Sequence, residues 1–347
     1  MKNKKLINNL ITYGIVILAF VLCKVAIANG DMTRSLKGQL IPICCWIVMA
    51  VSLNLVVGIS GELSLGHAGF MSVGAFTGII ASQWMLASGV EDKMVCLIVA
   101  LVVGGVFAAL AGIIIGIPVL RLSGDYLAIV TLAFGEIIRN VLNCVYVSVD
   151  AGALHVGFLN PSLPGKLILN GPNGATGVTK LATFEAGFVL VLITLFIVLN
   201  LINSRSGRAI MAVRDNRIAA ESSGINVTKY RMMAFVISAG LAGLAGALYG
   251  LNFSSIVAGK FKFDQSILVL VFVVLGGIGS IRGSVIAAAA LTVLPELLRG
   301  IGDYRMLIYA VVLIAVMLIT NNAKLKTWLD SLKKANKKTD GKAGAQA

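Results

Sequence analysis

The sequence predicts an all-α membrane protein, a polytopic bundle of about ten transmembrane helices, from three observations. The mean hydropathy is +0.94 and 13% of the residues are charged, whereas soluble domains carry about 25% charged residues. Apolar segments long enough to cross ~30 Å of hydrocarbon recur along the chain. Lysine and arginine gather in alternate connections between these segments, as expected of a chain that crosses a membrane repeatedly.

Ten apolar segments each predict one helix. They lie near residues 7–28, 39–60, 63–86, 94–120, 126–148, 184–203, 232–253, 265–280, 283–300 and 303–322. The eighth is short and ends in LGGIGSIRG, which predicts a broken or re-entrant helix, a form tolerated only where protein or a water-filled cavity shelters the backbone. Residues 1–323 therefore form a membrane domain. The basic tail 324–347 is expected to be an interfacial helix followed by disorder, held near anionic lipid.

Residues 1–28 allow two interpretations. MKNKK, an apolar run and AIANG together resemble a signal peptide with an A-x-A cleavage site at Ala26–Ala28. A retained first helix is favoured because many further spans follow. Cleavage would remove one helix and leave the orientation of the others unchanged.

The distribution of basic residues predicts the orientation. With the N-terminus inside and strict alternation, 18 of the 29 Lys and Arg residues fall on the inner side and nine on the outer side. Because inner loops are enriched in Lys and Arg, both termini are expected in the cytoplasm. The loop 204–231 is then cytoplasmic, and the turn-rich loop 149–183 is external. The net charge of +14 thus reflects topology, and no nucleic acid partner is expected, because aromatic residues do not alternate with basic ones.

Small residues predict dense helix packing. G-x-x-x-G spacing lets helix backbones approach closely in an apolar span, and it occurs at Gly74–Gly78, Gly112–Gly116, Gly246–Gly250 and Gly279–Gly283. The five cysteines lie in or beside apolar segments without metal-ligand spacing, and they are interpreted as small buried hydrophobic residues. They are Cys23, Cys44, Cys45, Cys96 and Cys144.

Motifs for enzyme chemistry are missing from the sequence. There is no G-x-x-x-x-G-K-[ST] to cradle ATP phosphates, no H-E-x-x-H, and the chain has two histidines. No metal site is therefore expected. Ser64 and His67 lie one helical turn apart, so an intramembrane Ser–His hydrolase is imaginable, but no further motif supports it. A hydrogen-bonded His67 within the bundle is the preferred interpretation, and no catalytic residue is assigned.

Charges inside the membrane are few, and the clearest are Glu136 and Arg139. At i, i+3 they share a helix face and can neutralise one another. Such a pair is either functional or a structural link between helices, and the sequence leaves both open. A proton-driven carrier would need a relay of membrane carboxylates or histidines, and one internally paired glutamate is a poor relay. If the chain is a carrier, its energy source is expected to lie on another chain.

The loop 204–231 carries six basic side chains between two strongly apolar segments. Its middle favours a helix, which Asp215 and Asn216 would break or cap and Gly224 would end. Met211, Ile218 and Ile225 recur every seven residues as an apolar edge. Such a helix suits a groove on a partner protein or the membrane surface, and physical reasoning alone leaves the choice open.

A family resemblance favours the partner protein. DNRIAAESSGI resembles the cytoplasmic coupling segment of ABC importer permeases. LNLVVGISGELSLGHAGFMSVGAFTG, RLSGDYLAIVTLAFGEIIRNV, NGPNGATGV, RSGRAIMAVRDNRIAAESSGINVTKYR and VLGGIGSIRGSVIAAAAL resemble the branched-chain amino acid ABC transporter permease family, most of all its M-type subunit. The likeness runs in order from about Ile41 to Thr320.

The resemblance implies a permease subunit of an importer for leucine, isoleucine and valine in the bacterial cytoplasmic (inner) membrane. Its partners would be a homologous H-type permease subunit, two cytoplasmic ATP-binding subunits and an extracytoplasmic substrate-binding protein. ATP and Mg²⁺ would be bound by the ATPase subunits, and no cofactor by this chain. Carried over by motif, the ATPase-coupling contact would comprise Arg208, Arg214, Asp215, Ala219, Ala220, Glu221 and Gly224. Arg217 stands where the family more often has an acidic residue.

Substrate would pass by alternating access through a gap lined by backbone dipoles and polar groups. The candidate lining residues come from two glycine-rich stretches and the fifth segment, and they are Ser64, Gly66, His67, Thr131, Glu136, Arg139, Gly276, Gly277 and Gly279. Related alternatives are urea, short amides, another amino acid or, more distantly, a sugar as the cargo. An autonomous secondary carrier or channel is the alternative from another class, and it leaves the basic loop unexplained.

Overall fold

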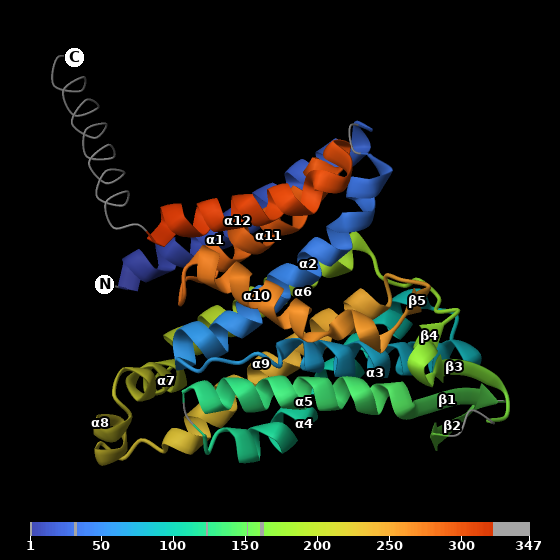
Figure 1. Ribbon diagram of the computed structural model, residues 1–347, viewed down its shortest axis with the longest axis horizontal. Helices are drawn as coiled ribbons and strands as arrows, with labels where there is room; N and C mark the ends of the chain where they lie inside the picture. Colours follow the sequence, from blue (N-terminus) through green and yellow to red (C-terminus); the bar gives the residue numbers. More distant parts are fainter. Residues whose placement is uncertain (1, 31–32, 123, 151, 160–162, 322–347) are drawn as a thin grey trace. The chain divides into compact units, whose positions relative to one another are not determined.

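The structure is a computed structural model that describes residues 2–30, 33–122, 124–150, 152–159 and 163–321. The chain divides into two units, residues 1–293 and 294–347. Each of the ten apolar segments contains a helix (Figure 1), and these helices are α1 (Lys2–Ala28), α2 (Arg34–Asn54), α3 (His67–Ala87), α4 (Lys93–Val119), α5 (Asp125–Cys144), α6 (Phe184–Asn203), α9 (Val227–Gly250), α10 (Phe263–Gly276), α11 (Ile281–Leu297) and α12 (Arg305–Asn321).

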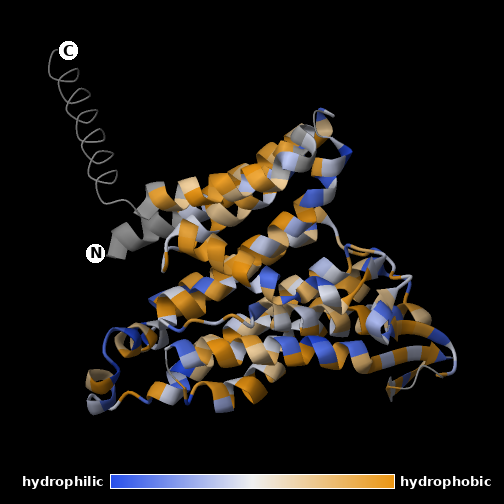
Figure 2. Cartoon of the chain, in the orientation of Figure 1, coloured by the Kyte–Doolittle hydropathy of each residue, from blue (hydrophilic) through white to orange (hydrophobic). Residues whose placement is uncertain are grey.

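Seven of the described helices are long and apolar enough to cross a membrane, so the chain is a multi-pass membrane protein. Figure 2 shows apolar residues along these helices and hydrophilic ones around the short helices α7 (Arg205–Asp215) and α8 (Arg217–Ser222). α10, α11 and α12 are shorter. Ten crossings therefore remain a prediction, whereas the helical membrane bundle is confirmed.

Helices α3, α4 and α9 pack closely because glycines remove side chains where they meet. A Cβ added to Gly78 would lie 2.7 Å from the Cβ of Ala247, and one added to Gly112 would lie 2.7 Å from the Cβ of Ala239. Real Cβ atoms do not approach so closely, so only glycine fits there. Helices in lipid associate mainly through such packing, and the predicted role of these glycines as close-packing positions is confirmed.

Helix α2 is the most deeply buried membrane helix, with Val48 to Val51 all 0% exposed. It continues into a π-helical segment, η1 (Leu55–Ser60), which ends at Gly61 with φ of +78°. Residues 61–66 then run without regular structure to His67, where α3 begins. The predicted third span began at residue 63, so its start was placed four residues too early.

The loop 149–183, predicted as external and turn-rich, contributes three strands to a small antiparallel sheet, which the all-α prediction missed. Its strand order is β2-β1-β3-β4-β5, and its strands are β1 (Val145–Asp150), β2 (Ala153–Phe158), β3 (Lys166–Asn170), β4 (Ala175–Thr176) and β5 (Ser255–Ile256). A bulge between Val147 and Ser148 shifts the β1–β3 register. The predicted helix 126–148 therefore ends at Cys144, where the chain becomes extended.

The predicted break in the eighth segment is confirmed. Helix α10 ends at Gly276, Gly277 and Gly279 adopt φ of +93° and +82°, and α11 begins at Ile281. Positive φ is accessible to glycine at no steric cost. In the second unit the 3₁₀ segment η4 (Leu298–Tyr304) precedes α12. The predicted tail helix lies outside the described residues.

All five cysteines are free. Cys44, Cys45 and Cys96 are buried, and Cys23 and Cys144 are partly buried. The prediction that they act as small apolar residues in the bundle therefore agrees with their positions.

Candidate functional site

The segment between α6 and α9 forms two short helices because polar side chains cap both of them. The Oγ of Ser204 accepts a hydrogen bond from the N–H of Gly207 (3.1 Å), which starts α7. The Oδ1 of Asn216 accepts one from the N–H of Ala219 (3.0 Å), which ends α7 and starts α8. Gly224 follows α8 with φ of +80°. The cap at Asn216 and the stop at Gly224 were both predicted.

The predicted apolar edge of this segment is wrong, because the break at Asn216 separates its members. Met211 packs on one apolar cluster and Ile225 on another. Ile218 instead is 80% exposed on α8. Ile218 is therefore the member of the predicted edge whose side chain faces away from the protein.

Six of the seven residues assigned to coupling are exposed, and Ala220 is buried. Ala219, Glu221 and Gly224 are exposed on or beside α8. Ala220 is 4% exposed and packs with Val213 and Val227, so its side chain fastens α8 to α7 and α9 and does not face outward. The remaining three, Arg208, Arg214 and Asp215, lie on α7.

Arg214 anchors α7 to the end of α2. Its Nη1 donates to the carbonyl oxygen of Gly58 in η1 (2.9 Å), while its Nε and Nη2 donate to Oδ1 of Asp215 (3.0 and 2.8 Å). Gly61 lies against the side chain, because an added Cβ would come 3.2 Å from Cδ of Arg214. Arg208 donates from Nη1 to the carbonyl of Asn203 (3.3 Å) at the end of α6. Both arginines thus tie α7 to a neighbouring helix end.

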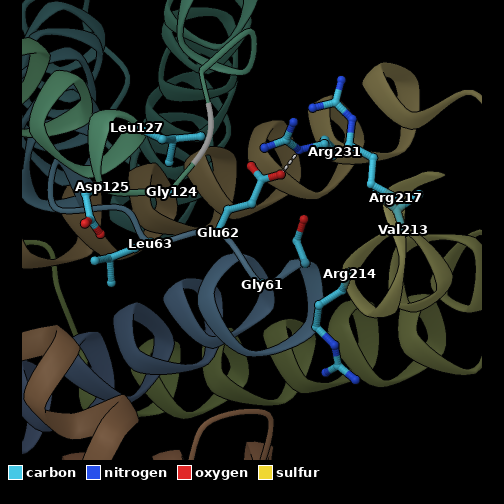
Figure 3. Close-up of a pocket in the computed structure, with 11 residues that line it drawn as sticks. Gly61, Glu62, Leu63, Gly124, Asp125, Leu127, Val213, Arg214, Arg217 and Arg231 are labelled. Atoms are coloured by element: carbon cyan, nitrogen blue, oxygen red, sulfur yellow. Dashed lines mark hydrogen bonds and ion pairs between the residues drawn. The ribbon is translucent and has the colours of Figure 1, made fainter.

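A cavity of about 260 Å³ lies beside Arg214, between α7–α8, the segment after η1 and the start of α5. Figure 3 shows its charged lining. The lining comprises Ser60, Gly61, Glu62, Leu63, Gly124, Asp125, Leu127, Val213, Arg214, Arg217 and Arg231. Three arginines and two carboxylates surround this one opening.

A buried ion pair lines this cavity and was not predicted. Glu62 and Arg231 are 7% and 8% exposed, and Nε of Arg231 donates to Oε1 of Glu62. Nη1 of Arg231 also donates to the carbonyl of Leu120 (3.2 Å) after α4. The pair therefore joins three elements: the segment after η1, α9 and the end of α4. Arg231 had been counted among the basic residues of the loop, but α9 begins at Val227 and includes it.

The irregular segment 61–66 contains two of the predicted path residues, Ser64 and Gly66, and contacts a third, Thr131. The N–H of Leu65 donates to Oγ1 of Thr131 (3.0 Å), and an added Cβ on Gly135 would lie 3.3 Å from Cα of Gly66. The Oγ of Ser64 is buried and has no hydrogen-bond partner within the described part of the chain. Such backbone is tolerated at membrane depth only where protein or a cavity shelters it.

His67 does not pair with Ser64. Its Nε2 lies 2.8 Å from Oγ of Ser52 on α2, and both side chains are buried. The preferred interpretation, a histidine hydrogen-bonded within the bundle, is confirmed. A nucleophile needs a base within hydrogen-bond reach, so this arrangement does not support the hydrolase alternative.

Glu136 and Arg139 form the predicted pair, with Nε of Arg139 2.7 Å from Oε2 of Glu136. The Oε1 of Glu136 also accepts a hydrogen bond from the N–H of Phe263 (3.3 Å), the first residue of α10. A carboxylate is favoured at a helix N-terminus, where N–H groups lack partners. Of the two interpretations left open, this contact favours a structural link between α5 and α10.

Of the three predicted glycines of the α10–α11 break, Gly279 contacts α2. The N–H of Gly279 donates to Oδ1 of Asn54 (2.8 Å). Gly276 and Gly283 are in backbone contact where α10 and α11 meet. Among the described residues, no group of three or more His, Cys, Asp or Glu side chains is arranged to hold a metal ion.

Known proteins resemble the chain over most of its length. The model of the family described as branched-chain amino acid transport system / permease component matches residues 37–320. LivM, a high-affinity branched-chain amino acid transport system permease protein, is 33% identical over 307 residues in both Salmonella typhimurium and Escherichia coli, covering 79% of this chain. LivH of Salmonella typhimurium is 24% identical over 279 residues, covering 79% of this chain and 89% of LivH.

The chain spans 66% of the length of the two LivM proteins. No solved structure matches the chain.

Proposed function

The chain belongs to the branched-chain amino acid transport system permease family, and from that premise we propose that it is the membrane-spanning subunit of an importer for leucine, isoleucine and valine. The match to residues 37–320 carries this proposal, because it covers the helices after α1, the α7–α8 segment and the α10–α11 break together. The chain itself performs no chemical step. It offers substrate a path and changes conformation when its partners act.

We propose that α7 and α8 form the contact with cytoplasmic ATP-binding subunits. Ile218, 80% exposed, would enter an apolar pocket on the ATPase, with Ala219 and Glu221 beside it. Arg214 would carry the movement inward, because it holds the carbonyl of Gly58 from α7. This arrangement follows the mode in which a short helix presents an apolar anchor to a groove.

The orientation that fits this role places both termini and α7–α8 in the cytoplasm, as the distribution of Lys and Arg predicts. The sheet would then lie outside the cell, where an extracytoplasmic substrate-binding protein delivers substrate. The second permease subunit would be a homologous chain, which the similarity of this chain to LivH supports. ATP and Mg²⁺ would reside on the ATPase subunits, in the bacterial inner membrane.

The substrate is a small zwitterion with an apolar side chain. A path for it needs polar atoms beside an apolar gap, and the segment 61–66 supplies the buried hydroxyl of Ser64, which lacks a partner among the described residues. The break at Gly277 and Gly279 supplies non-helical backbone. We propose that substrate passes between these two places during alternating access.

Purification from native membranes in mild detergent, followed by mass spectrometry of the associated chains, tests the proposal. We expect a homologous permease and two P-loop ATPases. The accompanying binding protein, titrated with leucine, isoleucine, valine and urea, then separates amino acid import from urea or amide import. A protein that purifies alone and transports in vesicles lacking ATP would support the carrier or channel alternative instead.

A further inference from the structure

Asn54, the last residue of α2, joins that helix to the α10–α11 break. Its side chain is 0% exposed. Its Nδ2 donates to Oγ of Ser284 (2.8 Å), and its Oδ1 accepts from the N–H of Gly279 (2.8 Å). A buried amide is tolerated when it is hydrogen-bonded, and here both ends of the amide are. One side chain therefore holds Gly279, within the break, and Ser284, in the first turn of α11.

The peptide of Gly58 lies between this break and α7. Its carbonyl accepts the hydrogen bond from Arg214. A Cβ added to Gly58 would lie 2.7 Å from Cα of Gly279, so the two backbones are in direct contact. Gly58 also belongs to η1. π-helical turns are rare in proteins, and those that occur are often found at functional sites.

We propose that Asn54 is a positioning residue that transmits movement of the α7–α8 segment, through η1, to the α10–α11 break. This rests on the proposed function, in which α7–α8 receives movement from the ATPases. Arg214 holds Gly58 by a charge-assisted bond, which is stronger than a neutral one. The buried amide of Asn54 is bonded at both ends, and a fully bonded buried group holds the elements that it joins rigidly. A displacement of α7 must therefore move η1 and the break together or rupture these bonds.

The test uses the complete importer in liposomes, with a cysteine reporter in the break. Ile278 is 61% exposed there, so Ile278→Cys reports the local environment through its rate of reaction with a thiol reagent. The reaction is followed on the peptide that carries residue 278, because the five native cysteines are free as well. Asn54→Leu removes both hydrogen bonds and keeps a similar volume. Ser238→Ala is the matched control, because Oγ of Ser238 also donates a buried bond to α2, to the carbonyl of Ser52 (2.6 Å), but it joins α2 to α9 and not to the break.

In the wild-type complex, ATP is expected to change the labelling rate of Ile278→Cys and to drive uptake. Asn54→Leu should lower uptake per ATP hydrolysed roughly tenfold, the usual size of a coupling effect, and make labelling insensitive to ATP. Ser238→Ala should retain both properties. Wild-type coupling in Asn54→Leu, or an equal loss in Ser238→Ala, would overturn the proposal.

If Asn54→Leu does not assemble, Ser284→Ala removes one of the two bonds and should lower uptake per ATP by a smaller factor. Unchanged coupling in that variant overturns the proposal as well. A wild-type complex without ATP-driven uptake refutes the proposed function itself and the role of Asn54 with it. Normal coupling in the wild type together with unchanged coupling in the variants refutes only the role of Asn54.

Discussion

Breaking the Glu62–Arg231 pair should destabilise the protein far more than breaking an exposed pair. In Glu62→Gln, Arg231 keeps its charge but loses its anionic partner, while its side chain stays 9% exposed. Removing one partner of a buried pair costs about 3–5 kcal/mol, because the other charge remains desolvated. The Lys24–Glu185 pair, with side chains 42% and 56% exposed, is the matched control, and exposed pairs contribute about 0–1 kcal/mol.

Equilibrium unfolding in mixed micelles of mild detergent and SDS measures both effects on the free energy of unfolding. We expect Glu62→Gln to lower it by several times the effect of Glu185→Gln. The double variant Glu62→Gln/Arg231→Met should recover part of the loss, since no charge is left buried. Equal effects of the two single variants, or no recovery in the double variant, would refute the reasoning from burial.

Three further changes test the α7–α8 end. Ile218→Asp should abolish co-purification of the ATPases without changing thermal stability, because the side chain is 80% exposed; retained ATPases would contradict the docking assignment. Arg214→Glu should lose the bond to Gly58 and lower uptake at least as much as Arg208→Glu. Gly224→Val must adopt φ near +80°, which costs about 1–2 kcal/mol. It should reduce uptake in a folded protein, whereas Gly14→Val, which meets open space in α1, should not; equal uptake would contradict the role of Gly224.

Features with a local signal were predictable from the sequence. The ten apolar segments each contain a helix, since apolar length alone indicates a span. Asn216 caps α8 and Gly224 follows its end, because these residue types favour these positions by their own chemistry. The Glu136–Arg139 pair was predictable because its members are three residues apart on one helix.

Features built from distant segments were not predictable. Glu62 and Arg231 are 169 residues apart, and nothing local distinguishes a loop arginine from one buried at the start of α9. The sequence did indicate that Glu62 has a partner, because it places a charged residue between two apolar segments, and a charge buried in a membrane protein needs a partner. It did not indicate which residue that partner is. The link from Asn54 to Gly279 spans 225 residues, and it depends on a π-helical turn that leaves no pattern in the sequence.

The sheet was missed for a related reason. Its strands β4 and β5 have two residues each, and β5 comes from the connection after α9. Ala175 pairs with Ile256, far away in the sequence. The alternation of apolar and polar residues within a short segment cannot predict such a long-range pairing. The glycine and proline content of the loop predicted turns, which occur between the strands.

The measurement that tests the central claim most directly is uptake of labelled leucine by liposomes containing the wild-type chain with its co-purified partners and binding protein. The account predicts uptake by right-side-out liposomes, in which the α7–α8 face points to the lumen. This uptake requires ATP in the lumen, and it stops when Ile218→Asp removes the ATPases. Uptake by the chain alone, or uptake unaffected by ATP, would contradict it.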